Sequence, residues 1–170
     1  MKTAANIIVT TLYNGISIVK LNEPKAYNAL SSQMLKSLIK VFKKLNNKKE
    51  TKVIIIEGSG KGFSAGHDLK EIKSLKKKSK YKKLFNLCSK LMLEIVEGKK
   101  PVIAKVHGAA FAAGCQLVAS CDLAISSDDA IFATPGVNIG LFCSTPMVAV
   151  SRNVSRKKIM KMLLTGDSID

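Results

Sequence analysis

The sequence has few arginines and few aromatic residues for a chain that carries so much positive charge. Only Arg152 and Arg156 accompany its lysines, tryptophan is absent, and aromatic residues make up 5% of the 170 positions. Lysine and arginine total 28 against 12 acidic residues, which gives a formal net charge of +16. Nucleic-acid binding usually combines clustered charge with arginines and stacking aromatics, so no nucleic-acid partner is expected.

Long apolar runs and paired cysteines are also missing. No uninterrupted apolar stretch approaches the roughly 18 residues that a membrane span needs, so no membrane span is expected. The cysteines form no C-x-x-C pair and have no paired histidines nearby, which predicts free thiols and no metal site: Cys88, Cys115, Cys121 and Cys143. Since 46% of the residues are apolar, the chain has enough material for one domain with a sizeable core.

The first residues give an expectation about location. Met1 to Asn6 run directly into a β-branched segment, with neither a secretory apolar region nor an arginine-rich amphipathic stretch. A cytoplasmic protein is therefore expected, and the mitochondrial matrix is the alternative if a leader is missing from the sequence.

Strand and helix patterns alternate along the chain. β-rich runs at 7–13 and 16–21 flank Asn14-Gly15, which favours a type I′ hairpin turn. Apolar residues at helical spacing predict helices after Ser31-Ser32, before Gly98, and from 155 to 164. Short apolar runs predict strands at 53–56, 102–106 and 122–126, the first of them buried on both faces. This alternation indicates a layered α/β fold.

Two loops of small residues stand out, Ser64–Leu69 and Ala112–Gln116. Each follows an apolar strand and precedes a helix. Two backbone N–H groups aimed at one point form an oxyanion hole, which stabilises negative charge that develops on a carbonyl oxygen. Tight packing of a helix against a strand is the alternative explanation for the small residues.

Three segments resemble one known family. Lys61–Glu71 closely resembles the first signature of the crotonase (enoyl-CoA hydratase/isomerase) superfamily, and Val106–Leu117 resembles the second. Leu21–Leu30 is similar to the turn of that superfamily that contacts coenzyme A. Gly66–Leu69 and Thr134–Ser144 resemble one branch of the superfamily in particular.

The resemblance implies a spiral of ββα units over residues 1–170, without the C-terminal helices of the superfamily. It implies an acyl-CoA substrate in fatty-acid or related thioester metabolism, with coenzyme A as part of the substrate and no separate cofactor. The oxyanion N–H groups fall on His67 and Ala113. A homo-oligomer, a trimer or a dimer of trimers, is expected of the full-length protein. The resemblance places coenzyme A contacts on Lys25, Ala26, Ala65, Asp68, Leu69 and Lys70.

The sequence departs from the hydratases of the superfamily at both catalytic acids. Hydration of an enoyl thioester needs an activated water and a proton donor, and two glutamates normally supply them. Gln116 and Gly136 stand at these positions here. Decarboxylation of a malonyl-type thioester, thioester hydrolysis, or non-catalytic acyl-CoA binding or regulation remain alternatives. If only the acids are missing, Gln116→Glu with Gly136→Glu should restore some hydration.

Several other residues admit two interpretations. The side chain of His67 is either a titratable group at the mouth of the hole or a surface or packed side chain, in which case His67 supplies only its backbone N–H. His107 is read as structural and Glu71 as solvated. Cys143 and Ser144 stand where they could face the acyl group. The lysine-rich stretch from 70 to 83 is either a solvated surface, a site for the phosphates of coenzyme A, or a contact for anionic lipid.

Overall fold

The computed structural model describes residues 6–170. The expectation about location rests on Met1 to Asn6, of which only Asn6 lies within the described residues. The main sheet has five strands in the order β1-β2-β3-β4-β6. Its strands β2, β3, β4 and β6 run parallel, and β1 pairs antiparallel with β2. The bounds are β1 (Ile7–Thr11), β2 (Ile16–Leu21), β3 (Val53–Gly58), β4 (Val102–Val106) and β6 (Leu123–Ser126).

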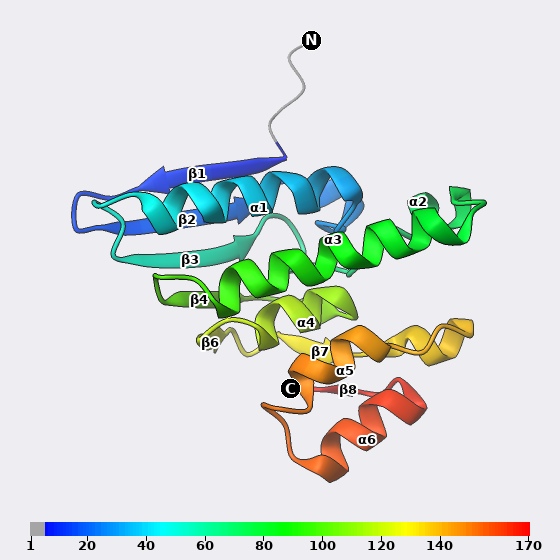
Figure 1. Ribbon diagram of the computed structural model, residues 1–170. Helices are drawn as coiled ribbons and strands as arrows, with labels where there is room; N and C mark the ends of the chain where they lie inside the picture. The colour runs from blue at the N-terminus through cyan, green and yellow to red at the C-terminus, as the bar shows by residue number, and fades with distance from the viewer. Residues whose placement is uncertain (1–5) are drawn as a thin grey trace.

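Helices connect the parallel strands, as the alternating pattern predicts. α1 (Ser32–Asn47) joins β2 to β3, and α2 (Leu69–Ser74) with α3 (Lys78–Val96) joins β3 to β4. α4 (Ala113–Ala119) precedes β6. A second, three-stranded sheet has the order β5-β7-β8, with β5 (Ala109–Phe111), β7 (Ile131–Ala133) and β8 (Ser168–Ile169). Figure 1 shows α5 (Ser144–Val150), α6 (Arg156–Thr165) and β8 together at the end of the molecule away from β1.

The hairpin between β1 and β2 forms where Asn14-Gly15 predicts it, but its turn type differs. Gly15 has φ +88°, whereas Asn14 is not in the left-handed region that a type I′ turn requires at both positions. The N–H of Gly15 donates to the Leu12 carbonyl, and the N–H of Leu12 donates to the Ile16 carbonyl. The type I′ prediction is wrong: these bonds describe a three-residue loop, a type I turn followed by a bulge at Gly15.

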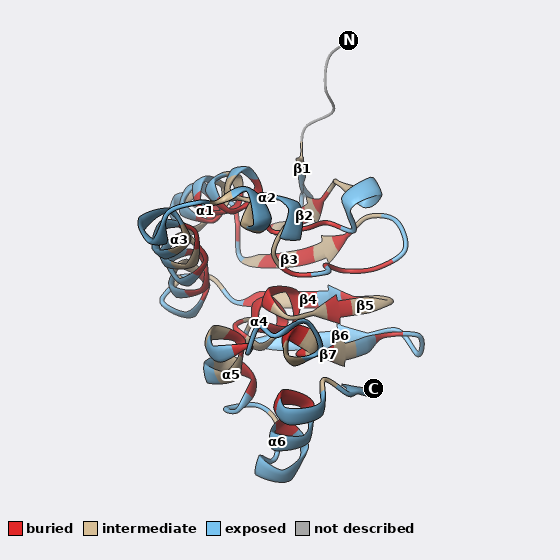
Figure 2. Ribbon diagram, turned by 90° about the vertical axis from the view of Figure 1, so that its right-hand side faces the viewer, coloured by how far each residue is buried: buried red, intermediate tan, exposed pale blue. Residues whose placement is uncertain are grey.

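The helices cover one face of the main sheet. Figure 2 shows α1 and α3 on one side of β2, β3 and β4. Ile54 and Ile56 of β3 point into this side and are fully buried, while Ile55 on the other face is only half-buried. The prediction that 53–56 is buried on both faces is therefore wrong. A run of isoleucines does not indicate whether helices cover one face of the sheet or both.

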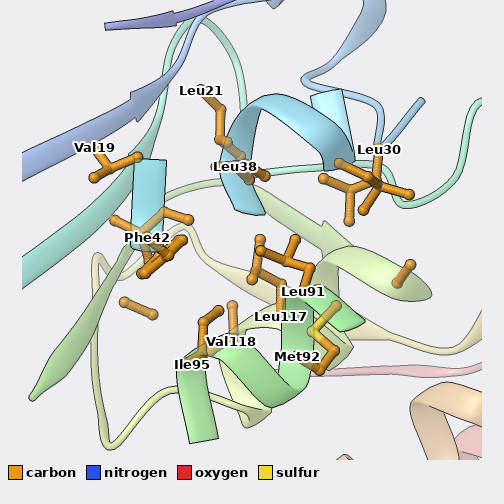
Figure 3. Close-up of a cluster of buried hydrophobic side chains, with 14 of the residues drawn as sticks. Val19, Leu21, Leu30, Leu38, Phe42, Leu91, Met92, Ile95, Leu117 and Val118 are labelled. Atoms are coloured by element: carbon orange, nitrogen blue, oxygen red, sulfur yellow. The ribbon is translucent and has the colours of Figure 1, made fainter. Parts of the chain in front are cut away.

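The core lies between this sheet face and the helices (Figure 3). The Ser31 hydroxyl caps α1 by accepting the N–H of Met34, as the Ser31-Ser32 signal predicts. The apolar stripe of α1 is buried throughout, with Phe42 and Leu38 among its fully buried residues. Leu91 and Ile95 of α3 face it, so the helical spacing in both segments predicts the core correctly.

Two small-residue segments join the sheets. Isolated bridges pair Gly62 with Gly108 and Ser64 with Ala110, so the loop after β3 crosses the start of β5. η1 (Pro24–Ala26) and η2 (Pro135–Ile139) are short 3-10 helices that precede and follow these loops in the sequence.

No helix within 6–170 combines the length and apolar character that a membrane span requires.

Candidate functional site

Asn28 fixes the loop that follows β3. Its side chain is buried, and its Nδ2 donates to the carbonyls of Ser59, Gly62 and Phe63 at 2.8, 3.0 and 3.1 Å. Its Oδ1 accepts the N–H of Glu23 at 3.0 Å. The backbone of Asn28 has φ +52°, a conformation that asparagine tolerates better than most residues. One amide therefore ties the early turn at 23–28 to the loop at 59–63.

Ser64 carries the same loop onto β5. Its N–H donates to the Ala109 carbonyl at 3.1 Å, and its carbonyl accepts the N–H of Phe111 at 2.9 Å. Its hydroxyl donates to the Asn28 carbonyl at 2.9 Å. Gly114 lies so close that a Cβ there would collide with the Ser64 carbonyl oxygen. The small residues of both loops are therefore needed for backbone-to-backbone packing, as the tight-packing alternative predicts.

The same crossing brings the positions of His67 and Ala113 together. Gly66 has φ +90°, and a Cβ on it would lie 3.1 Å from the Ala113 nitrogen. Among the described residues, neither the His67 N–H nor the Ala113 N–H donates a backbone hydrogen bond. Ala113 is the first residue of α4, where N–H groups have no partner within the helix. Two unengaged N–H groups thus occur where the two loops meet.

Ala112 holds the start of α4 in a strained conformation. Its φ of 48° and ψ of −116° lie in a region that residues with a Cβ rarely adopt. Its N–H donates to the Ala133 carbonyl at 2.8 Å, and the N–H of Gln116 donates to the Ala112 carbonyl at 3.0 Å. These bonds and the packing of Ala113 hold the strained turn in place.

A cavity of about 600 Å³ opens beside the crossing loops. Ala65, His67 and Ala112 line it on the side of the loops. Most of the remaining wall is apolar and comes from several elements: Ile72, Phe85, Phe111, Ile139, Leu141 and Phe142. Cys143 and Ser144 also line the cavity.

The His67 ring forms part of the cavity wall. Because a carbonyl only accepts, the 3.2 Å contact between Nδ1 and the Leu30 oxygen makes Nδ1 the protonated nitrogen. The Phe85 ring meets the imidazole edge-on, with centroids 5.3 Å apart. Burial lowers the pKa of His67 below its ordinary 6.5, against the Leu30 carbonyl and the Glu71 charge, which raise it. Nε2 is buried and has no hydrogen-bond partner among the described residues.

Neither of the two positions at which the family resemblance expects a catalytic glutamate has a carboxylate here. Gln116 is 6% exposed, and its Oε1 is buried without a partner in the described part of the chain. A Cβ on Gly136 would collide with the Leu141 carbonyl oxygen and lie 2.8 Å from the Cys143 sulfur. Burial raises the pKa of the Cys143 thiol, against an opposing effect of the Gly136 backbone.

Five of the six predicted coenzyme A contacts are exposed, and the sixth, Asp68, is half-buried. Lys25 and Ala26 are exposed on η1, and Lys70 is exposed on α2. Ala65 and Leu69 are exposed and reach the cavity. The Asp68 carboxylate is engaged at the start of α2, where Oδ1 accepts the N–H groups of residues 70 and 71 at 2.8 and 3.1 Å.

Glu71 and His107 do not line the cavity and have structural contacts elsewhere. The prediction that Glu71 is solvated is wrong: its Oε2 accepts the N–H of Ser32 at 2.8 Å and so ties α2 to the start of α1. His107 is structural, as predicted, because its Nε2 lies 2.9 Å from the Gly60 carbonyl, to which it donates. No group of three or more metal-binding side chains occurs in the part of the chain that the structure describes.

The comparisons with known proteins identify the family. The family described as Enoyl-CoA hydratase/isomerase matches residues 11–170. The chain belongs to this family, the crotonase superfamily, and the crotonase-like fold that the three motifs imply is confirmed. The solved structure of an enoyl-CoA hydratase from Mycobacterium smegmatis is 47% identical, with a TM-score of 0.95 over 98% of this chain and 65% of its own.

The branch resemblance is confirmed as well. Enoyl-CoA hydratase domain-containing protein 3, mitochondrial, of Danio rerio is 50% identical over 163 residues, which are 96% of this chain and 56% of the relative. The solved human protein of that name is 48% identical, with a TM-score of 0.93 over 97% of this chain and 65% of its own. The chain thus spans a little over half the length of the zebrafish relative.

Proposed function

We propose that the protein binds an acyl-CoA thioester whose carbonyl oxygen accepts hydrogen bonds from the N–H groups of His67 and Ala113. The observation that carries this proposal is the pair of unengaged N–H groups at the loop crossing, beside an apolar cavity. Family membership supports acyl-CoA as the ligand class. The exposed amines of Lys25 and Lys70 are suited to the phosphates of coenzyme A, outside the cavity.

The chemistry that suits this site is stabilisation of a thioester oxyanion or enolate without a pair of carboxylates. Two N–H donors act on charge that develops on the carbonyl oxygen. Gln116 orients a water only by hydrogen bonds, since an amide does not take up its proton. Decarboxylation breaks a carbon–carbon bond and needs no activated water. Thioester hydrolysis needs one activated water but, unlike hydration, no proton delivered to carbon. Non-catalytic acyl-CoA binding is the second candidate, because the backbone closes over the position of the second acid.

A pair of ligands tests the binding mode without altering the protein. Butyryl-CoA and the thioether S-butyl-CoA have the same chain length, but only the thioester has a carbonyl oxygen. Two neutral hydrogen bonds are worth about 0.5–1.5 kcal/mol each, so the thioester should bind roughly 10-fold more tightly by calorimetry. Equal affinities would remove the two N–H groups from recognition of the thioester carbonyl.

Turnover assays decide between the two candidates. Crotonyl-CoA, malonyl-type and saturated acyl-CoA thioesters are incubated with the protein, and products are identified by mass spectrometry. Hydrolysis or decarboxylation supports oxyanion catalysis, and hydration of crotonyl-CoA would contradict the proposed chemistry. Binding without any product favours the non-catalytic function.

The proposal extends to location and assembly. Relatives named as mitochondrial support the mitochondrial matrix, the alternative among the two expected locations. Subcellular fractionation with a matrix marker checks this. A trimer or a dimer of trimers is the proposed assembly of the full-length protein, and sedimentation of that protein measures it.

A further inference from the structure

The cavity beside the loop crossing is larger than a short acyl group requires. Its volume is about 600 Å³. A methylene takes up about the same space as a water molecule in the liquid, roughly 30 Å³. The four carbons of a butyryl or crotonyl group therefore fill only about a fifth of the volume, and a chain of eight to sixteen carbons fills much more of it.

The chemistry of the wall selects against charge on the acyl group. No lysine, arginine, aspartate or glutamate lines the cavity, and of its polar residues Asn138 and Ser144 are exposed while Thr145 and the His67 ring are half-buried. A carboxylate carried into this space finds no cation there, and an unpaired buried charge is costly. The abundant lysines of the chain lie outside the wall, where they meet solvent.

The cavity also exposes apolar side chains that a ligand would cover. Leu69 is 55% exposed, Leu141 42% and Phe142 46%, and all three line the cavity. They come from α2 and from the loop before α5, so they border the space from two different segments. An acyl chain that lies between these segments would remove apolar surface from water on both sides, which favours binding.

We propose that the acyl group of this site is an uncharged aliphatic chain of about eight to sixteen carbons. This inference rests on the proposed binding of acyl-CoA and adds the class of acyl group. It is carried by the volume, by the absence of charged lining residues, and by the exposed apolar side chains of the wall. Short acyl groups and dicarboxylic acyl groups such as malonyl and succinyl are outside this class. Of the two reactions named under the proposed function, this acyl class is therefore compatible with thioester hydrolysis and not with decarboxylation.

Calorimetric titration with a ligand series tests the proposal. The ligands are coenzyme A and its acetyl, butyryl, octanoyl, dodecanoyl and succinyl thioesters, each below its micelle concentration. Burial of a methylene improves affinity about fourfold, so octanoyl-CoA should bind on the order of 100-fold more tightly than butyryl-CoA. Succinyl-CoA should bind at least roughly 10-fold more weakly than butyryl-CoA, because its carboxylate finds no cation.

Cavity-filling variants separate chain binding from attraction to the basic surface. Ile72→Trp should weaken dodecanoyl-CoA at least roughly 10-fold and leave free coenzyme A unchanged, because the indole takes up volume in the wall. Leu93→Trp is the matched control, since Leu93 is 51% exposed and does not line this cavity. Leu141→Trp serves the same purpose if Ile72→Trp melts at a lower temperature than the parent protein.

The outcomes are distinguishable from those of the proposed function. Affinities that do not rise from butyryl to dodecanoyl, or a succinyl thioester that binds as well as butyryl, overturn the proposed acyl class but leave thioester binding intact. If every thioester binds only as tightly as coenzyme A, the proposed function itself fails. A dodecanoyl affinity that Ile72→Trp and Leu141→Trp both leave unchanged places the chain elsewhere on the protein.

Discussion

The carbonyl oxygen of Leu141 occupies the space that the first side-chain carbon of any residue at Gly136 would need. The N–H of Leu141 donates to the Gly136 carbonyl at 2.9 Å, so the two residues close a tight loop between them. The family resemblance places the second catalytic acid at this position. The missing carboxylate is therefore accompanied by a backbone path that excludes a side chain.

The first prediction is that Gly136→Ala lowers the free energy of unfolding by about 3 kcal/mol, because the collision involves backbone atoms that cannot rotate away. Gly140→Ala is the control: its φ is +72°, and a Cβ there meets nothing within 4 Å. It should cost only about 1 kcal/mol, the strain of the left-handed conformation. Urea denaturation of both variants measures the difference, and equal losses would show that the Leu141 carbonyl moves aside easily.

The same geometry corrects the expectation that Gln116→Glu with Gly136→Glu restores hydration. The second substitution cannot be made in this backbone without displacing Leu141. We expect the double variant to show no hydration of crotonyl-CoA and a lower thermal midpoint than Gln116→Glu alone. Hydration above background by a folded double variant would contradict this.

The second prediction concerns Ala112. Ala112→Gly should raise the free energy of unfolding by about 1 kcal/mol, because glycine adopts φ 48° without the Cβ strain of alanine. Ala119→Gly at the C-terminal end of α4 should instead lower it by about 0.5–1 kcal/mol, the usual cost of a helical glycine. Chemical denaturation checks the opposite signs. A destabilised Ala112→Gly would mean that the turn is not strained.

The third prediction concerns Asn28. Asn28→Ala should cost about 3 kcal/mol, because two buried carbonyl groups and a partly buried one lose their donor at once. Asn47→Ala should cost less than about 0.5 kcal/mol, since Asn47 donates only to the exposed Lys43 carbonyl. Denaturation curves measure both. Hydrogen exchange of residues 59–66 should accelerate in the first variant and stay unchanged in the second.

The fourth prediction is a pH dependence that arises from His67. Its folded-state pKa lies below 6.5, so the unfolded chain binds the proton more readily. The contribution of His67 to stability is therefore complete above about pH 6.5 and falls as the pH drops from there toward its folded-state pKa. In His67→Asn, an amide can replace the Nδ1 donor without titrating. The variant should lose less stability than the parent between about pH 6.5 and 5, and identical pH profiles would exclude His67 as the source.

Local features of the chain were predictable from sequence, because they depend on neighbours a few residues away. The buried face of α1 and its Ser31 cap follow from spacing and hydroxyl chemistry within one segment. The exposure of Ile55 was not predictable, because it depends on which sheet face the helices cover. The turn at Gly15 also differs from its prediction, because Asn14-Gly15 is compatible with more than one loop length.

For the site, the motifs predicted which two loops meet but not how. The hydrogen bonds of Asn28 to residues more than 30 positions later leave no pattern near Asn28 itself. Phe85 and Phe142 line the cavity from distant segments, and nothing local marks them as wall residues. The obstruction at Gly136 arises from the path of the chain at Leu141, which a match of residue types cannot show.

The bridges between Gly62 and Gly108 and between Ser64 and Ala110 have a consequence for the order of events during synthesis. The hairpin, α1 and β3 can form while the chain is still growing, and the turn around Asn28 can already hold the loop after β3, but the bridges of that loop to β5 form only when β5 leaves the ribosome. The pair of N–H groups is completed later still, when α4 follows. A ligand held by both groups would bind only the state in which the two sheets are joined, and it would therefore slow their separation.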